Sequence, residues 1–174
     1  MMASFVVIGA TGDVGRGIVG ALLERGHAVI AVARNEDGLA ALAAEWGNPA
    51  ALRSCVGNFA DDGAAAALAA AIAGMADTIS GVVISINGPR QLPGLLALSS
   101  AQFQSLVGLD LITHFTAARA LIPAIAPGGV LIGIGGGSAD FILAGGAHMS
   151  VAQAGLRMLY RGLAQELGET AVHI

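Results

Sequence analysis

Short runs of apolar, mostly β-branched residues alternate along the chain with longer stretches in which apolar positions recur every three or four residues. The short runs predict buried strands, and the longer stretches predict helices with one apolar face. Such an alternation is typical of an α/β domain with a parallel sheet. The predicted strands cover residues 5–8, 28–33, 52–56, 81–86, 129–134 and the start of another at 171–174. The predicted helices cover residues 13–25, 36–46, 62–75, 100–126 and 149–167.

Glycine, proline and aspartate residues mark the ends of the predicted elements. Gly26 follows the first helix as a C-cap residue, and Asp61 precedes the third helix as an N-cap residue. Pro123 ends or bends the long fourth helix, and residues 89–98 are predicted to form a loop. No stretch has the composition of a linker, so residues 1–174 are predicted to form a single doubly wound α/β domain with strand order 3-2-1-4-5.

Composition limits the classes of binding partner and the cellular compartment that suit the chain. With 55 % hydrophobic and 11 % charged residues, the chain suits a sheet buried on both faces and favours further apolar burial against another subunit. The net charge of −4 offers no basic surface for nucleic acid. A single cysteine, Cys55, excludes an intrachain disulfide and favours a cytoplasmic location. No apolar run is expected to span a membrane, and the N-terminus does not have the pattern of a signal peptide.

Three glycines, Gly9, Gly12 and Gly15, stand between the first predicted strand and the first predicted helix. In a strand–turn–helix unit the first glycine allows a sharp turn, the second lets a phosphate approach the backbone, and the third lets the helix pack closely. The unpaired N–H groups at the start of the helix suit a pyrophosphate. A glycine-rich turn without a ligand is the simpler alternative, but the βαβ context favours a dinucleotide site.

Arg34 and Asn35 directly follow the second predicted strand. At this place in a dinucleotide-binding fold an acidic residue favours NAD, whereas an arginine accommodates the 2′-phosphate of NADP. Because the guanidinium fork matches phosphate geometry, Arg34 favours NADP over NAD. An exposed arginine at the start of a helix is the alternative interpretation.

Residues after the third and fourth predicted strands are also predicted to contact the cofactor, because the carboxyl ends of parallel strands lie on the ligand side of the sheet. The Asn-Gly-Pro that follows the fourth strand is also a good turn sequence in its own right. No metal-binding cluster is expected. The candidate cofactor-binding residues are Gly9, Thr11, Gly12, Asp13, Val14, Gly15, Arg34, Asn35, Asn58, Phe59, Asn87 and Gly88.

Over essentially its whole length, the sequence resembles the short-chain dehydrogenase/reductase family. The resemblance implies a Rossmann sheet, a nicotinamide cofactor, and a homodimer or homotetramer built through the two long helices. It also implies that the C-terminal part of the usual fold is absent from these 174 residues. The similarity rests on Gly-Ala-Thr-Gly-Asp-Val-Gly at 9–15, Ala-Arg-Asn at 33–35, Asn-Phe-Ala-Asp at 58–61, Asn-Gly at 87–88, and the segments 107–115, 128–134 and 154–167.

The family's chemistry uses an asparagine, a serine, a tyrosine and a lysine, and this sequence departs from that set. The asparagine position is Asp110, and the serine position is Gly136, with Ser138 two residues further on. The tyrosine and lysine positions hold Met149 and Gln153, and the chain contains no lysine. By the resemblance, Gln153 is a candidate to hydrogen-bond the cofactor ribose, but it does not supply the charge that lowers a tyrosine pKa.

Asp110, Ser138 and His148 are the candidates for a substitute catalytic set. Asp110 and His114 are four residues apart on one helical face, a spacing that suits a proton-relay pair or an ordinary helix pair. His148 and Ser138 also have alternative interpretations as loop and turn residues. Tyr160, the only tyrosine, stands far along the last helix and is interpreted as a packing or interface residue.

The leading hypothesis is an NADP-preferring oxidoreductase of the short-chain type that acts on a carbonyl or alcohol substrate with a non-standard active site. The alternative is a non-catalytic NAD(P)-binding sensor or partner subunit, which the missing tyrosine and lysine favour. An isomerase or dehydratase with the same fold is a third hypothesis. The expected partners are a small-molecule substrate and further copies of the chain, with neither nucleic acid nor a membrane.

Overall fold

The computed structural model describes residues 3–88, 94–142, 144–168 and 172–174. Strands and helices alternate along the chain as the sequence predicts. The strands are β1 (Ser4–Ile8), β2 (Ala28–Ala33), β3 (Leu52–Val56), β4 (Ile79–Ile84), β5 (Ile125–Gly133) and β6 (Val172–His173). The α-helices are α1 (Asp13–Glu24), α2 (Glu36–Glu45), α3 (Asp62–Ala73), α4 (Ser100–Val107), α5 (Thr113–Leu121) and α6 (Ala147–Leu167). Shorter helical turns are η1 (Leu95–Ala97), η2 (Gly108–Ile112), η3 (Ile122–Ala124) and η4 (Gly137–Ala139).

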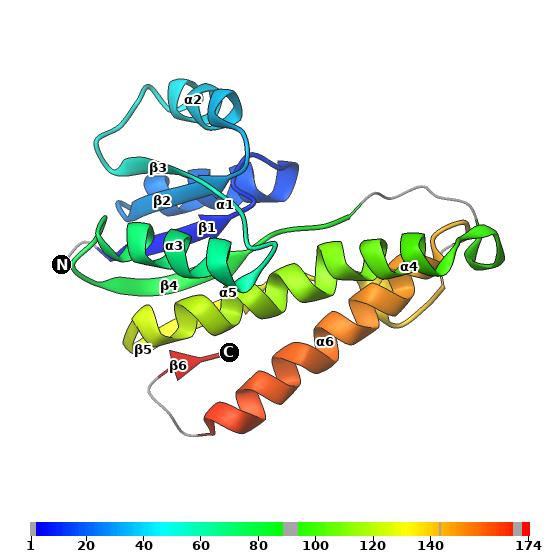
Figure 1. Cartoon of the computed structure of the whole chain (residues 1–174). Helices are drawn as coiled ribbons and strands as arrows, with labels where there is room; N and C mark the ends of the chain where they lie inside the picture. Colours follow the sequence, from blue (N-terminus) through cyan, green and yellow to red (C-terminus); the bar gives the residue numbers. More distant parts are fainter. Residues whose placement is uncertain (1–2, 89–93, 143, 169–171) are drawn as a thin grey trace.

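The described strands form one parallel sheet in the order β3-β2-β1-β4-β5-β6, which confirms the predicted order of the first five (Figure 1). The order reverses between β1 and β4, because the chain first builds outward through β2 and β3 and then returns to the other side of β1. In folds of this kind, ligands bind at the carboxyl ends of the strands beside such a reversal.

Helices cover both faces of the sheet (Figure 1). On one face, α1 and α2 pack on β1 and β2, and α2 contributes the buried residues Leu39 and Leu42. On the other face, α3 and α5 pack on the sheet, and Tyr160 of α6 packs against the same core. Because successive strand residues point to opposite faces, Val6 and Val7 of β1 belong to different cores, and each has 0 % exposure.

Three predicted strand boundaries were wrong by two residues or more, namely both ends of β4 and the start of β5. β4 begins and ends two residues earlier than predicted, since Ser80 interrupts the apolar run without ending the strand. β5 begins at Ile125 rather than at Gly129, because the strand pairing of β4 and β5 contains a shift in register. Gly128 lies in this shifted segment with φ of +80°, a conformation that favours glycine. Part of the predicted loop 89–98, and residue 171 of the last predicted strand, lie outside the described residues.

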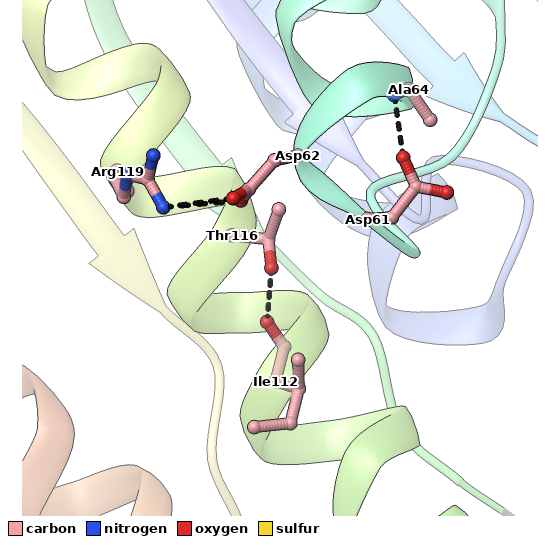
Figure 2. Close-up of polar contacts among 6 residues, drawn as sticks. All are labelled: Asp61, Asp62, Ala64, Ile112, Thr116 and Arg119. Atoms are coloured by element: carbon pink, nitrogen blue, oxygen red, sulfur yellow. Dashed lines mark hydrogen bonds and ion pairs between the residues drawn. The ribbon is translucent and has the colours of Figure 1, made fainter.

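The predicted fourth helix contains a π-helical turn, η2, between α4 and α5. A π turn carries an extra residue and is frequent at functional sites. Asp110 lies in the middle of η2 and is 4 % exposed. Below the turn, the Thr116 hydroxyl donates to the Ile112 carbonyl oxygen at 2.8 Å (Figure 2).

The helical run Ser100–Ala124 has 25 residues, and an 18-residue window within it has a mean hydropathy of 1.3, so by length and composition it is long enough to cross a membrane. This finding corrects the expectation that no such run exists. Core helices of globular domains pass the same test. Here Ala117, Ala118 and Leu121 of the run are 0 % exposed in the core beneath the sheet. The absence of a membrane partner stays a prediction.

Polar contacts at the start of α3 join it to α5 (Figure 2). Asp61 caps α3 as predicted, and its carboxylate accepts the Ala64 N–H at 2.8 Å. The neighbouring Asp62 carboxylate accepts hydrogen bonds from Arg119 of α5 at 3.1 and 3.2 Å. Both partners are mostly exposed, so the ion pair orients the helices more than it stabilises them.

Candidate functional site

Close backbone approaches shape the glycine turn after β1. Gly9 has φ of +78°, and a Cβ atom there would lie 2.1 Å from the Ser85 carbonyl oxygen. A Cβ atom on Gly15 would lie 2.1 Å from the Gly9 carbonyl oxygen, so α1 packs directly against the turn. Gly12 is the N-cap of α1 and supplies no side-chain cap. The first N–H groups of α1 are therefore available to an anion such as a phosphate.

A cavity of about 750 Å³ lies at the carboxyl ends of β1, β2 and β4. This volume falls within the range of small-molecule and cofactor sites, and the position is the one at which doubly wound folds bind nucleotides. Ten of the predicted cofactor residues line it, which are Gly9, Thr11, Gly12, Asp13, Val14, Arg34, Asn58, Phe59, Asn87 and Gly88.

Other residues of the cavity wall were not predicted. Ser85 and Ile86 follow β4 and line the cavity, although the sequence assigned them to the strand itself. Leu109 and Thr113 also line it, from η2 and the start of α5. Helical periodicity does not reveal a π turn, so no pattern pointed to these two. The remaining wall residues are neighbours of predicted ones, namely Ile8, Val32, Ala33, Gly57 and Ala60.

Arg34 lines the cavity and is exposed, and within the described residues its side chain has neither a hydrogen-bond nor an ion-pair partner. Its guanidinium is therefore available to an anionic ligand. Asn35, predicted as a cofactor residue, caps α2, and its Oδ1 accepts the Gly38 N–H at 3.3 Å. Its contact with a cofactor stays a prediction. A Cβ atom on Gly38 would lie 3.2 Å from Thr11 Cγ2, so α2 begins close to the glycine turn.

Two buried side chains reach the end of β4 from behind the cavity. Asp110 Oδ1 accepts the Gly88 N–H. Gln153 is 3 % exposed, and its Oε1 accepts the Gly136 N–H at 2.7 Å, while its Nε2 donates to Asn87 Oδ1 at 3.2 Å. Gln153 was predicted to reach the cofactor ribose. In this structure its hydrogen bonds go to protein groups, because the side chain points between the ends of β4 and β5.

Asp110 and His148 are buried close enough to interact electrostatically. Burial raises the pKa of the Asp110 carboxyl above its ordinary value, because it penalises the charged form. The Gly88 N–H, the electrostatic interaction with His148 and the side chain of Gln153 all oppose this rise. His148 is the second residue of α6 and the first of its buried residues, with 4 % exposure. The structure thus brings together two of the three catalytic candidates.

Ser138, the third catalytic candidate, is half-buried in η4. Its Oγ lies 3.6 Å from the position that a Cβ atom would take on Gly136. Hydrogen bonds between the following loop and α6 hold this segment, since the Asp140 carboxylate pairs with both terminal nitrogens of Arg157. Ser138 therefore lies on an anchored turn at the carboxyl end of β5.

His114 is 0 % exposed and does not form the expected proton-relay pair with Asp110. Its Nε2 lies 3.0 Å from the Ile86 carbonyl oxygen, and its Nδ1 lies 3.0 Å from the Tyr160 hydroxyl. A carbonyl oxygen only accepts, so Nε2 carries the proton and the Tyr160 hydroxyl donates to Nδ1. Burial lowers the pKa of His114, in agreement with a neutral imidazole. The relay prediction was wrong because both imidazole nitrogens are engaged elsewhere.

The glycine turn, the cavity at the strand ends and the reversal of strand order together describe a dinucleotide-binding domain. A family model described as enoyl-(acyl carrier protein) reductase matches residues 9–174, nearly the whole chain. The chain belongs to the short-chain dehydrogenase/reductase family. This finding confirms the family resemblance seen in the sequence.

Solved structures of short-chain dehydrogenases superpose on 99 % of the chain. One from Streptomyces avermitilis has 22 % identity and a TM-score of 0.88, and this chain spans 64 % of it. A glucose/ribitol dehydrogenase-type member from Brucella melitensis has 20 % identity, a TM-score of 0.90 and 72 % coverage. A third from Mycobacterium ulcerans has 21 % identity, a TM-score of 0.87 and 65 % coverage. At these identities the likeness establishes the fold, and no curated protein matches the sequence.

Proposed function

We propose that the protein is an NADP-preferring oxidoreductase of the short-chain type, with a non-standard active site that acts on a carbonyl or alcohol substrate. The supporting observation is the cavity at the ends of β1, β2 and β4, into which the glycine turn and Arg34 both face. The family to which the chain belongs uses nicotinamide cofactors. When bound, such a cofactor supplies or takes the hydride, and the residues of the chain position it.

Arg34 is the residue proposed to select NADP. It follows β2, where the adenosine ribose lies in dinucleotide-binding folds. Among the described residues no acidic side chain pairs with its guanidinium, so the guanidinium is available to bind a 2′-phosphate. Within the cavity wall, Asp13 is the one acidic residue, and it belongs to the first turn of α1.

Titration of the purified protein with NADPH and NADH, followed by cofactor fluorescence, tests the proposal directly. We expect NADPH to bind more tightly than NADH. Arg34→Ala should weaken NADPH binding about ten- to hundredfold, the size of a lost charge-assisted hydrogen bond of ~1.5–3 kcal/mol, with NADH changed little. Arg25→Ala is the matched control, because Arg25 is also exposed but its guanidinium bonds the Ala21 carbonyl at the other end of α1. Equal weakening of both cofactors by Arg34→Ala would remove the selective role.

The proposed catalytic set is Asp110, His148 and Ser138. Reduction of a carbonyl needs a proton at the developing alkoxide as well as a hydride. Met149, at the family's tyrosine position, has no proton to transfer. Asp110 and His148 interact at the buried start of α6, and Ser138 lies on the turn after β5. A non-standard site would draw its proton from these groups.

A non-catalytic NAD(P)-binding sensor is the second candidate, and one observation favours it. Gln153 and Asp110, at the family's lysine and asparagine positions, use their hydrogen bonds on Gly136, Asn87 and Gly88. Oxidation of NADPH in the presence of a panel of aldehydes and ketones separates the two candidates. Turnover that Asp110→Ala abolishes even at saturating NADPH favours the enzyme. Tight cofactor binding without any turnover favours the sensor.

We also propose that the protein forms a homodimer or homotetramer through α4, η2, α5 and α6. These helices expose large apolar side chains, among them Leu109, Ile112, Phe115, Val151 and Met158, each at least 39 % exposed. A second copy of the chain would remove them from water. Light scattering after size-exclusion chromatography should therefore give two or four times the chain mass, and Ile112→Glu should lower it. A cytoplasmic location and the absence of a nucleic-acid partner stay predictions.

A further inference from the structure

The backbone at 86–88, immediately after β4, has left the sheet and yet forms a wall of the cavity. Strand pairing therefore does not hold it. The Ile86 carbonyl and the Gly88 N–H belong to half-buried residues, and each needs a partner from elsewhere because a buried polar group without one is costly. Asn87 between them is exposed. The following residues, 89–93, lie outside the described part of the chain.

His114 supplies the partner for the Ile86 carbonyl. Its imidazole is 0 % exposed, and its protonated Nε2 donates to the Ile86 oxygen at 3.0 Å. This bond requires one of two possible tautomers. The Tyr160 hydroxyl selects that tautomer, because it lies 3.0 Å from Nδ1 and donates to it.

Tyr160 is itself held in place by its contact with β5. A Cβ atom on Gly133 would lie 2.1 Å from Tyr160 Cζ, so the ring lies directly against a strand position where only glycine fits. The His114 and Tyr160 rings meet edge to face, with centroids 5.9 Å apart. The pair thus links α5, α6 and β5 to the end of β4.

Two further side chains hold the same segment from the same two helical runs. Asp110, four residues before His114, accepts the Gly88 N–H. Gln153, seven residues before Tyr160, donates to Asn87 Oδ1 at 3.2 Å. Spacings of four and seven place each pair on one helical face. Each of the three residues after Ser85 therefore bonds one buried side chain.

We propose that His114 and Tyr160 are positioning residues for the cofactor, which act through Ile86 by holding the 86–88 backbone as a preformed wall of the cavity. Asp110 and Gln153 support the same segment at its other two residues. This inference rests on the proposed cofactor binding and deepens it. A preformed wall lowers the ordering cost of binding, so loss of the pair should weaken the cofactor without contact between either side chain and the ligand.

Variants of the pair test the inference through the Kd of NADPH. Tyr160→Phe removes only the hydroxyl and keeps the ring beside Gly133, and we expect the Kd to rise about threefold to tenfold. His114→Leu leaves the Ile86 carbonyl unpaired and should raise it about tenfold. His114→Gln restores an amide donor for that carbonyl and should return the Kd to within about twofold of the wild type. His27→Gln is the control, since His27 packs edge to face on Phe5 at the amino end of the sheet.

The unfolding free energy of each variant, measured alongside, separates positioning from a purely structural role. Positioning predicts that His114→Gln binds NADPH better than His114→Leu even where the two are equally stable. The inference fails if His114→Leu and Tyr160→Phe bind NADPH as tightly as the wild type, or if glutamine restores nothing. Should His114→Leu not fold, Tyr160→Phe and His114→Gln still decide the question. A wild-type protein that binds neither NADPH nor NADH would instead overturn the proposed function, and this inference with it.

Discussion

Gly15→Ala and Gly17→Ala are the same substitution at two positions of one helix, and the structure predicts opposite effects. Both glycines lie within α1. A Cβ atom on Gly17 meets nothing within 4 Å, whereas a Cβ atom on Gly15 would lie 2.1 Å from the Gly9 carbonyl oxygen and 2.9 Å from Ala10 Cα. The contact at Gly15 is with backbone, so no side-chain rotation relieves it.

The magnitudes follow from helix propensity and from that contact. Alanine in place of an exposed helical glycine stabilises by about 0.5–1 kcal/mol, and Gly17→Ala should gain this amount. Gly15→Ala gains the same propensity, but the turn and the helix must separate by more than an ångström to reach ordinary contact. Overpacking of this kind costs about 1–3 kcal/mol. A central difference of about 2 kcal/mol between the two variants corresponds to ~4–8 °C in Tm for a domain of this size.

Urea and thermal unfolding followed by Trp46 fluorescence measure this difference. Trp46 is the only tryptophan, and it packs against Gly20 of α1, where a Cβ atom would lie 2.3 Å from the indole ring. We expect Gly17→Ala to unfold above the wild type and Gly15→Ala below it. Gly15→Ala should also weaken NADPH binding, because the displaced helix start no longer faces the cavity. Equal unfolding midpoints for the two variants would refute the close approach and the reasoning built on it.

Three further predictions concern the core, the surface and the pH dependence. Leu121 has 0 % exposure, so Leu121→Ala should lower the unfolding free energy by about 2–5 kcal/mol in urea titration. Arg119→Ala should lower it by less than about 1 kcal/mol, because the ion pair of Arg119 is exposed. Because burial raises the pKa of Asp110, the unfolding free energy of the wild type should fall as pH rises from the ordinary value of 3.8 through the higher native pKa. Asp110→Asn should remove that fall, and an unchanged pH profile in this variant would contradict the prediction. Burial lowers the pKa of His114, so stability should fall as pH drops from the ordinary value of 6.5 toward the lower native pKa, and His114→Gln should flatten this slope in unfolding titrations between pH 7 and pH 4.

The β1–turn–α1 unit was predictable because its signals are local. The spacing of Gly9, Gly12 and Gly15 fixes a sharp turn and a close helix, and the structure has both close approaches. The strand order followed from the alternation of strands and helices. Arg34 was placed at the cavity by its position directly after β2.

The contacts behind the cavity were not predictable, because they join residues far apart in sequence. Tyr160 and His114 are 46 positions apart, and neither carries a signal of its partner. Asn35 illustrates a different limit. The same side chain suits a cofactor contact and a helix cap, and only the geometry of α2 shows that it caps the helix. Local sequence patterns therefore predicted most of the cavity wall but not the buried side chains that support it.

The π turn at Gly108–Ile112 determines where the helical run tolerates a change in length. Because the turn holds one residue more than an α-helical turn, deleting one residue within it converts it to an α-helical turn and leaves α5 in phase with α4. Leu121 then keeps its place in the core and His114 its contact with Ile86. A deletion within α5 itself has no wide turn to absorb it, and it would rotate the residues on its two sides against each other by about 100°. A one-residue deletion should therefore cost far less stability in the π turn than in α5.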